Sequence, residues 1–272
     1  MYILNGEVYR NDVNTISPTS QAFMFGYGLF ETLKVSKGQI LFFDEHLKRL
    51  EEGCKILNLD LNTQTSRIIE DSYRLLEFKN IKDGVLKVLY AKNGCENYLL
   101  LTTRENPYTE SDYEKGFKIM FSDLKRNQDS ILTFIKSNNY MENLLAKEKS
   151  AKLGFDEVIF LNTDDFVCEG AVSNIFWIKE DIIYTPSVEC GLLPGIVREK
   201  VLIVLERLGF KVEIGKFNKE DIINCDEAFI TNSVMDIMPV SQIEASTFII
   251  DENSLVSKII NEYNDLIGED YE

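Results

Sequence analysis

The order of the apolar patterns along this chain constrains its fold more than any other feature. Short runs typical of strands are interspersed with amphipathic helical segments, and they follow no regular strand–helix–strand alternation. Strands are expected at 30–35, 40–43, 85–91, 98–103, 117–121, 131–136, 157–161, 175–179, 182–184, around Val212, 228–231 and 248–250. Helices are expected at 45–57, 65–78, 141–153, 194–209 and 254–267. This order predicts a mixed α+β protein.

A polar stretch near the middle divides these patterns into two groups. Residues 104–116 read RENPYTESDYEKG, which is rich in charge and contains a proline. Such a composition is typical of a connection between lobes. We therefore predict an N-terminal α/β lobe at 1–108, a linker at 109–116 and a C-terminal lobe at 117–272. A chain of 272 residues with 44% apolar content can bury the core that such lobes need.

The charge and the cysteine content exclude several classes of protein. The formal net charge is -16, which repels phosphate backbones and anionic lipids, so we expect neither nucleic acid nor membrane as a partner. The five cysteines include no C-x-x-C pair, and the chain contains one histidine, His46, so we expect no metal site. The N-terminus is too polar for a signal peptide, and no apolar run is long enough for a membrane span. These features predict a reduced, cytoplasmic protein.

Lys136 is the first residue that could carry chemistry. It follows the apolar run ILTFI, which indicates a partly buried amine at the end of a strand. Burial disfavours the ammonium form and lowers the pKa of a lysine. A neutral amine is a nucleophile toward aldehydes. The alternative is an ordinary surface lysine, and the spacing alone leaves both interpretations open.

Glu169 is an acid among apolar residues, in FVCEGAVSN just before the apolar run NIFW. A carboxylate that points inward there needs a cation or several hydrogen-bond donors. A pyridinium nitrogen is one such cation, whereas the alternative is a solvated carboxylate in a turn.

The sequence LLPGIVR at 192–198 predicts a helix start with a small residue, Gly195, beside the first backbone N–H groups. A helix N-terminus of this kind attracts phosphate, although these residues taken alone fit an ordinary helix start better. Ser233 supplies a further hydroxyl after the strand at 228–231.

Arg49 lies on the helix expected at 45–57. At about 100° per residue it lies well away from the apolar stripe of that helix and shares a face with His46 and Gly53. A solvated surface arginine is the alternative interpretation.

Taken together and in order, these segments resemble the class IV aminotransferase family, the pyridoxal-phosphate (PLP) enzymes of fold type IV. That family contains branched-chain aminotransferases, D-amino acid aminotransferases and aminodeoxychorismate lyases. The resemblance is carried by FGYGLFETLKV, DEHLKRL, FIKSNNYMENLLAKEKSAKLGFDEVIFLN, VCEGAVSNIFWI, IIYTP, LLPGIVRE and DEAFITNSVMDIMPV. It implies a two-lobed fold like that of D-amino acid aminotransferase, with PLP in the cleft between the lobes. It also implies a homodimer.

The resemblance assigns roles to individual residues. Lys136 matches the lysine that forms the Schiff base with PLP, and Glu169 matches the acid that pairs with its pyridine nitrogen. Tyr140 matches a tyrosine near the phenolic oxygen, although the loop here is one residue shorter. Val197 stands where most members have threonine, so its backbone N–H remains but a hydroxyl contact is lost. The implied cofactor-binding residues are Arg49, Lys136, Tyr140, Glu169, Ser173, Asn174, Ile196, Val197 and Ser233, with Lys136 catalytic.

The residues expected to contact the substrate depart from the family pattern. Lyases and D-amino acid enzymes usually carry an arginine in an S/T-R-G segment after the strand at 85–91, where this chain has YAKNG. Lys92 supplies a point charge there without the bidentate geometry of arginine. Phe30 stands where the D-amino acid enzymes have a tyrosine that contacts the substrate.

These departures leave two reactions open. We expect an aminotransferase that moves an amino group between a small amino acid and a 2-oxo acid. The alternative is an aminodeoxychorismate lyase that releases pyruvate and forms 4-aminobenzoate for folate synthesis, because GVLKVLY and SNNYMENLLAK look most like such lyases. A PLP-binding protein without catalytic activity is a third hypothesis, which the presence of both Lys136 and Glu169 disfavours.

Overall fold

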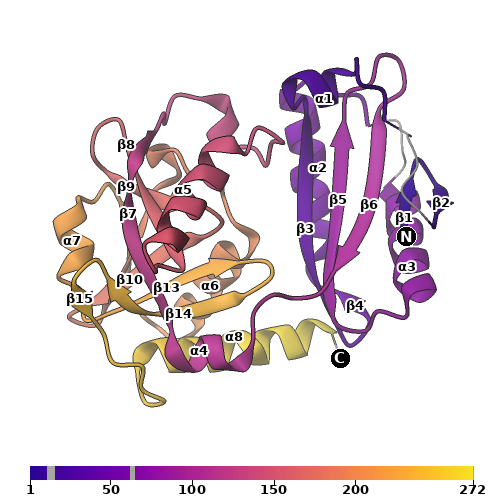
Figure 1. The fold of residues 1–272 in the computed structure, drawn as a ribbon. Helices are drawn as coiled ribbons and strands as arrows, with labels where there is room; N and C mark the ends of the chain where they lie inside the picture. Colours follow the sequence, from indigo (N-terminus) through magenta and orange to yellow (C-terminus); the bar gives the residue numbers. More distant parts are fainter. Residues whose placement is uncertain (11–15, 62–64, 272) are drawn as a thin grey trace. The chain divides into compact units, whose positions relative to one another are not determined.

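The computed structural model describes residues 1–10, 16–61 and 65–271. The chain forms two compact units (Figure 1), one of Met1–Pro107 with Ile135–Tyr140 and the other of Tyr108–Phe134 with Met141–Glu272. The segment Ile135–Tyr140 thus packs with the first unit, whereas the chain on either side of it belongs to the second.

The first unit is an antiparallel sheet covered by helices. The strand order is β2-β1-β6-β5-β3-β4, and β3 pairs with β5 along nearly its whole length. Its strands are β1 Tyr2–Leu4, β2 Glu7–Tyr9, β3 Gly28–Ser36, β4 Gln39–Ile40, β5 Gly84–Ala91 and β6 Tyr98–Arg104. Its helices are α1 Gln21–Phe25, α2 Phe43–Ile56 and α3 Thr65–Lys79.

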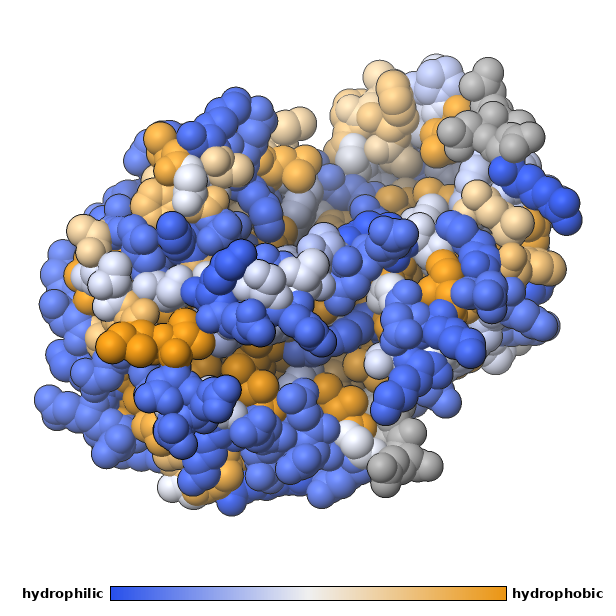
Figure 2. Space-filling view, turned by 60° about the horizontal axis from the view of Figure 1, so that its bottom comes forward, coloured by the Kyte–Doolittle hydropathy of each residue, from blue (hydrophilic) through white to orange (hydrophobic). Residues whose placement is uncertain are grey.

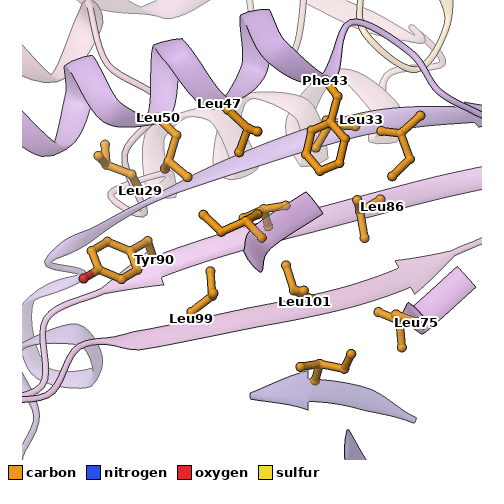
Figure 3. Close-up of a cluster of buried hydrophobic side chains, with 14 of the residues drawn as sticks. Leu29, Leu33, Phe43, Leu47, Leu50, Leu75, Leu86, Tyr90, Leu99 and Leu101 are labelled. Carbon is orange, nitrogen blue, oxygen red and sulfur yellow. The ribbon is translucent and has the colours of Figure 1, made fainter. Parts of the chain in front are cut away.

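Figure 3 shows the core of this unit, where leucines from the sheet face leucines from α2. Leu33 of β3 and Leu47 and Leu50 of α2 are among its buried members. A Cβ at Gly53 would lie 2.8 Å from Cδ1 of Leu29, so glycine allows α2 to approach β3 closely. The apolar stripe predicted for this helix therefore faces the sheet.

The second unit has a mixed sheet with the strand order β12-β11-β10-β13-β14-β7-β8-β9, and β15 pairs with β14. Its strands are β7 Phe117–Arg126, β8 Glu157–Asn162, β9 Val167–Gly170, β10 Asn174–Lys179, β11 Ile182–Pro186, β12 Val212–Gly215, β13 Glu227–Asn232, β14 Asp236–Ile243 and β15 Ser246–Thr247. Its helices are α4 Glu110–Lys115, η1 Ile131–Thr133, α5 Met141–Lys152, η2 Val188–Cys190, α6 Ile196–Arg207, α7 Lys219–Ile223 and α8 Leu255–Tyr271.

The strand predicted at 131–136 is wrong. Residues Ile131–Thr133 form the 3-10 helix η1, because the Ser130 hydroxyl accepts a hydrogen bond from the backbone N–H of Leu132. Local side-chain bonds of this kind compete with strand formation. The first two apolar side chains are not buried, since Ile131 is 57% and Leu132 is 40% exposed. The buried apolar residue of the run is Ile135, which packs into the core of the first unit.

Two further predictions differ from the structure. Residues 109–116, predicted as a linker, contain helix α4, which begins with a reciprocal cap between Thr109 and Asp112 and packs in the second unit. The strand predicted at 248–250 is also wrong, since the adjoining strand β15 is Ser246–Thr247 and residues 248–250 carry no strand. In both places, short apolar or polar patterns gave too little periodicity to define an element.

Most of the face of the molecule drawn in Figure 2 is hydrophilic, as expected for a chain with 45 acidic and 29 basic residues. Within the described residues, no helix combines the length and the apolar character needed to cross a membrane.

The core of the second unit gives a test of the packing. Trp177, the one tryptophan of the sequence, is buried in this core, so intrinsic fluorescence reports its unfolding. Ile230→Ala on β13 removes a side chain that is 0% exposed and should lower the free energy of unfolding by about 2–5 kcal/mol. Ile214→Ala on β12 is the matched control, since Ile214 is 52% exposed and should cost no more than about 1 kcal/mol. Equal losses in urea unfolding of the two variants would contradict this packing.

Candidate active site

The Lys136 amine lies against aromatic rings of the first unit. The backbone around it is attached to the start of β3, because Phe30 N–H donates to Lys136 C=O at 2.9 Å and Asn138 N–H donates to Gly28 C=O at 2.9 Å. Its Nζ lies 4.8 Å from the ring centroid of Phe30 and 6.0 Å from that of Tyr140. These two rings contact each other edge to face at 5.4 Å. The half-buried amine is therefore held beside two of the predicted site residues.

Arg49 is not the solvated surface residue of the alternative interpretation. Its Nε donates to Glu31 Oε1 at 2.9 Å, and its Nη2 donates to Glu31 Oε2 at 2.7 Å. The Arg49 side chain is 13% exposed and that of Glu31 is 3% exposed. The pair joins α2 to β3 by a bidentate contact, which is the strong geometry for arginine and carboxylate.

His46 completes this cluster. Its Nδ1 lies 2.7 Å from Glu31 Oε2, and the ring is buried. Burial lowers the pKa of His46, and the charges of Arg49 and Lys136 add to this effect, although Glu31 opposes them. Burial alone would raise the pKa of Glu31, but the charge of Arg49 and the hydrogen bonds from Arg49 and His46 outweigh it and lower the pKa to about 2. Glu31 is thus a buried carboxylate that stays ionised.

The amine of Lys87, and not that of the predicted Lys92, contacts the ring of Phe30 from β5. Lys87 of β5 pairs with Thr32, which places it diagonally beside Phe30 on one face of the sheet, and its Nζ lies 4.5 Å from the Phe30 centroid. Burial lowers the pKa of Lys87, with a smaller contribution from the charge of Arg104. Lys92 follows β5 and is half-buried, with its backbone N–H donating to Tyr27 C=O. The sequence reasoning missed Lys87, although the alternation of residues 85–91 could have placed it on this face.

Glu169 lies in the second unit, on β9, and is 8% exposed. Its Oε2 accepts a hydrogen bond from Leu193 N–H at 3.0 Å, and its Oε1 lies 3.4 Å from Arg126 Nη2. Glu169 is therefore the inward-pointing carboxylate of the sequence analysis and not a solvated acid in a turn, whereas its pairing with a pyridinium nitrogen stays a prediction. Arg126 favours the ionised form of Glu169, because a nearby opposite charge stabilises it.

Arg126 is a site residue that the sequence reasoning missed. It is the last residue of β7, is 7% exposed, and donates from Nη1 to Asn143 Oδ1 at 3.2 Å. Its guanidinium lies 4.2 Å from the ring centroid of Phe160. The partners come from α5, β8 and β9, so only the folded chain reveals them.

The predicted phosphate-binding helix begins as expected. Helix α6 starts at Ile196 after Gly195, which caps it without a side-chain hydrogen bond. A Cβ at Gly195 would lie 2.0 Å from Asn174 Oδ1, so a larger residue there would displace the Asn174 side chain. Asn174 also donates from Nδ2 to Leu193 C=O at 3.0 Å. These contacts place Asn174 beside Leu193 and Gly195, at the start of α6.

Ser233 lies in the turn between β13 and β14 and is half-buried. Its neighbour Asn232 donates from Nδ2 to Val172 C=O at 3.1 Å, which ties this turn to the segment after Glu169. Asn174 pairs with Thr231 in the sheet. The second unit therefore gathers Glu169, Asn174, the start of α6 and Ser233 in one region.

Glu157 supports the segment that follows Glu169. Its side chain is buried and accepts hydrogen bonds from the N–H groups of Val158, Ala171 and Val172 at 2.9, 3.2 and 3.3 Å, and from the Ser173 hydroxyl at 3.3 Å. Burial raises the pKa of Glu157, although Lys147 and these N–H groups oppose it. The Ser173 hydroxyl thus bonds within the protein, and its contact with a cofactor stays a prediction.

The predicted residues fall into two sets. Phe30, Arg49, Lys136 and Tyr140 belong to the first unit, as does Lys92. Glu169, Ser173, Asn174, Ile196, Val197 and Ser233 belong to the second unit. One set presents an amine and a guanidinium, and the other presents a carboxylate and a helix N-terminus.

Comparisons with known proteins agree on the family. The chain is 30% identical over 256 residues to an aminodeoxychorismate lyase of Bacillus subtilis, covering 90% of this chain and 87% of that one. It is 29% identical over 252 residues to a D-alanine aminotransferase of Staphylococcus epidermidis, covering 89% and 88%. A branched-chain amino acid aminotransferase of Escherichia coli superposes with a TM-score of 0.90 at 21% identity, covering 98% and 94%.

That superposition confirms the predicted α+β fold of type IV. A model of the amino-transferase class IV family matches residues 28–243, which is most of the chain. The chain therefore belongs to the class IV aminotransferase family.

Proposed function

We propose that this protein is a PLP-dependent aminotransferase that exchanges an amino group between a small amino acid and a 2-oxo acid. Enzymes of its family use PLP. The observation that carries the proposal is the position of Lys136. Its backbone is hydrogen-bonded to β3, and its amine lies beside Phe30 and Tyr140. An amine fixed in this way is suited to react with a carbonyl group.

The side chains that are present fit PLP. An aldehyde requires an amine, and Lys136 supplies one. A phosphate requires N–H donors and positive charge, which Arg49 and the α6 N-terminus supply. A pyridine nitrogen requires a carboxylate, which Glu169 supplies. We propose that Arg49, the N–H groups of Ile196 and Val197, and Ser233 hold the phosphate.

When bound, PLP supplies an aldehyde that links to amines and a ring that accepts the electrons of a carbanion. We propose that the Lys136 amine would hold the cofactor through its aldehyde, and that the freed Nζ would carry the proton that leaves the substrate Cα to C4′ of the cofactor. The backbone attachment to β3 fixes the main chain from which the Lys136 side chain extends. The ring of Tyr140 lies beside the same amine, with its centroid 6.0 Å from Nζ.

Glu169 keeps a proton on the pyridine nitrogen in this proposal. Its carboxylate must remain ionised to do so, and Arg126 at 3.4 Å together with the Leu193 N–H stabilises that form. Asn143, in turn, accepts a hydrogen bond from Arg126 and fixes its orientation. Arg126 therefore supports Glu169, and Asn143 in turn supports Arg126.

A second candidate is an aminodeoxychorismate lyase that releases pyruvate and forms 4-aminobenzoate. Lys87 is the specific observation that favours it, because its amine and that of Lys136 contact the same Phe30 ring. A second cation there suits a substrate with more than one carboxylate.

We also propose that the protein acts as a homodimer, as the resemblance implies, and sedimentation of the purified protein tests this.

Lys136→Ala should abolish the visible absorption band of the PLP-bound protein, because the covalent partner of the aldehyde is lost. Activity should fall by about 100-fold or more. Lys55→Ala, on the exposed end of α2, is the control and should keep both properties. An unchanged spectrum in Lys136→Ala would refute the role of this lysine and leave the hypothesis of a non-catalytic protein standing.

Glu169→Gln should retain PLP but lower kcat by about 100-fold or more, because the amide cannot stabilise a proton on the ring nitrogen. Glu142→Gln is the matched control, since Glu142 lies 3.6 Å from the same arginine, Arg126, but is exposed. Stopped-flow absorbance measures the rate of the first half-reaction in each variant. Equal rates in the two variants would contradict the proposed role of Glu169.

The two candidate reactions differ in their requirement for a second substrate. An aminotransferase should convert bound PLP into pyridoxamine phosphate with one equivalent of amino acid and turn over only when a 2-oxo acid is added. A lyase should release pyruvate from aminodeoxychorismate without any acceptor. Pyruvate release with no amino-group exchange for a panel of L- and D-amino acids would replace the first candidate with the second.

A further inference from the structure

We propose that Glu31 is a positioning residue that fixes the guanidinium of Arg49 for the phosphate group of PLP. This inference rests on the proposed function, because it takes the phosphate as the ligand of Arg49. It concerns a buried acid of the first unit to which the sequence analysis gave no role.

The contact between Glu31 and Arg49 has a defined geometry. Both carboxylate oxygens accept hydrogen bonds from the arginine, Oε1 from Nε at 2.9 Å and Oε2 from Nη2 at 2.7 Å. Two parallel bonds fix the plane of the guanidinium as well as its distance. An arginine side chain without such a partner samples many rotamers.

The strand that carries Glu31 makes the position rigid. Residues Gly28–Ser36 of β3 pair with β5 in continuous register, and Glu31 lies opposite Val88. The neighbouring Phe30 bonds to the backbone of Lys136. The carboxylate that orients Arg49 and the backbone that orients the reactive amine thus come from adjacent residues of one strand.

His46 also restrains the carboxylate of Glu31, in addition to Arg49 and strand β3. It lies one helical turn before Arg49 on α2, and its Nδ1 is 2.7 Å from the same Oε2 that Arg49 contacts. Because an ionised carboxylate can only accept hydrogen bonds, Nδ1 donates a hydrogen to it. The contact with Glu31 is the hydrogen bond that orients the buried His46 ring within the described part of the chain.

Glu31 has two opposing effects on a bound phosphate. Its negative charge repels the phosphate, whereas its hydrogen bonds orient the cation that attracts it. Arg49 stands next to the carboxylate and neutralises it at contact distance, so the repulsion is reduced. We therefore expect orientation to dominate, and the sign of the effect of a mutation tests this expectation.

The experiment compares PLP with pyridoxal, which has the same aldehyde and ring but no phosphate. The full-length protein is stripped of PLP and titrated with each compound, and the dissociation constants are read from absorbance. Glu31→Gln should weaken PLP binding about tenfold or more, which corresponds to about 1.4 kcal/mol, and pyridoxal binding less than about threefold. Glu31→Asp keeps the charge but shortens the side chain, and it should also weaken PLP binding selectively.

Asp71→Asn is the matched control. Asp71 is another buried carboxylate of the first unit, 2% exposed and 3.1 Å from its arginine partner Arg74. Its loss should lower the thermal unfolding midpoint without changing the ratio of PLP to pyridoxal affinity. A selective loss of PLP affinity in Asp71→Asn would show that the readout reports stability, and it would overturn the inference.

Arg49→Ala separates the inference from the proposed function. If Arg49→Ala leaves the ratio of affinities unchanged, the assignment of Arg49 to the phosphate fails. If Arg49→Ala weakens PLP binding but Glu31→Asp and Glu31→Gln bind PLP as tightly as the unmodified protein, or more tightly, the inference about Glu31 fails while the proposed function stands. Should Glu31→Gln not fold, the Glu31→Asp variant decides the question alone.

Discussion

The attachment of residues 135–140 to β3 is the interaction on which the proposed chemistry depends. The chain on both sides of this segment belongs to the second unit, yet the segment buries Ile135 in the first core and pairs its backbone with Gly28 and Phe30. A lysine side chain is long and flexible, so a fixed backbone is the main restraint that the fold can place on its amine. Phe30 and Tyr140 supply the remaining restraint through contact with that amine.

Each unit also contains a buried carboxylate beside an arginine, and the two pairs have opposite purposes. In the first unit, Glu31 orients the cation Arg49, which is the group proposed to bind a ligand. In the second, the cation Arg126 supports the anion Glu169, which is the group proposed to bind a ligand. Burying a charge without a partner is costly. Arg49 and Glu169, which are proposed to bind the ligand, are therefore each paired with a residue of opposite charge.

Elements with clear periodicity were predictable from the sequence, such as α2, whose apolar stripe packs on β3. The segment at 131–136 was not, because a single hydroxyl, that of Ser130, turns an apolar run into η1. Lys136, Glu169 and Arg49 were proposed as site residues from motif order, whereas no role was assigned from the sequence to Arg126, Glu157 and Lys87. Their partners lie on other strands and helices, and a linear pattern carries no signal for such contacts.

The central claim is that PLP is bound covalently to the amine of Lys136. Reducing the PLP-loaded protein with sodium borohydride makes this bond permanent, and peptide mass spectrometry then locates the pyridoxyl group. The account predicts a single modified lysine, in the peptide that contains Lys136, at one group per chain. A protein labelled at other lysines, or left unlabelled although PLP is bound, would contradict it.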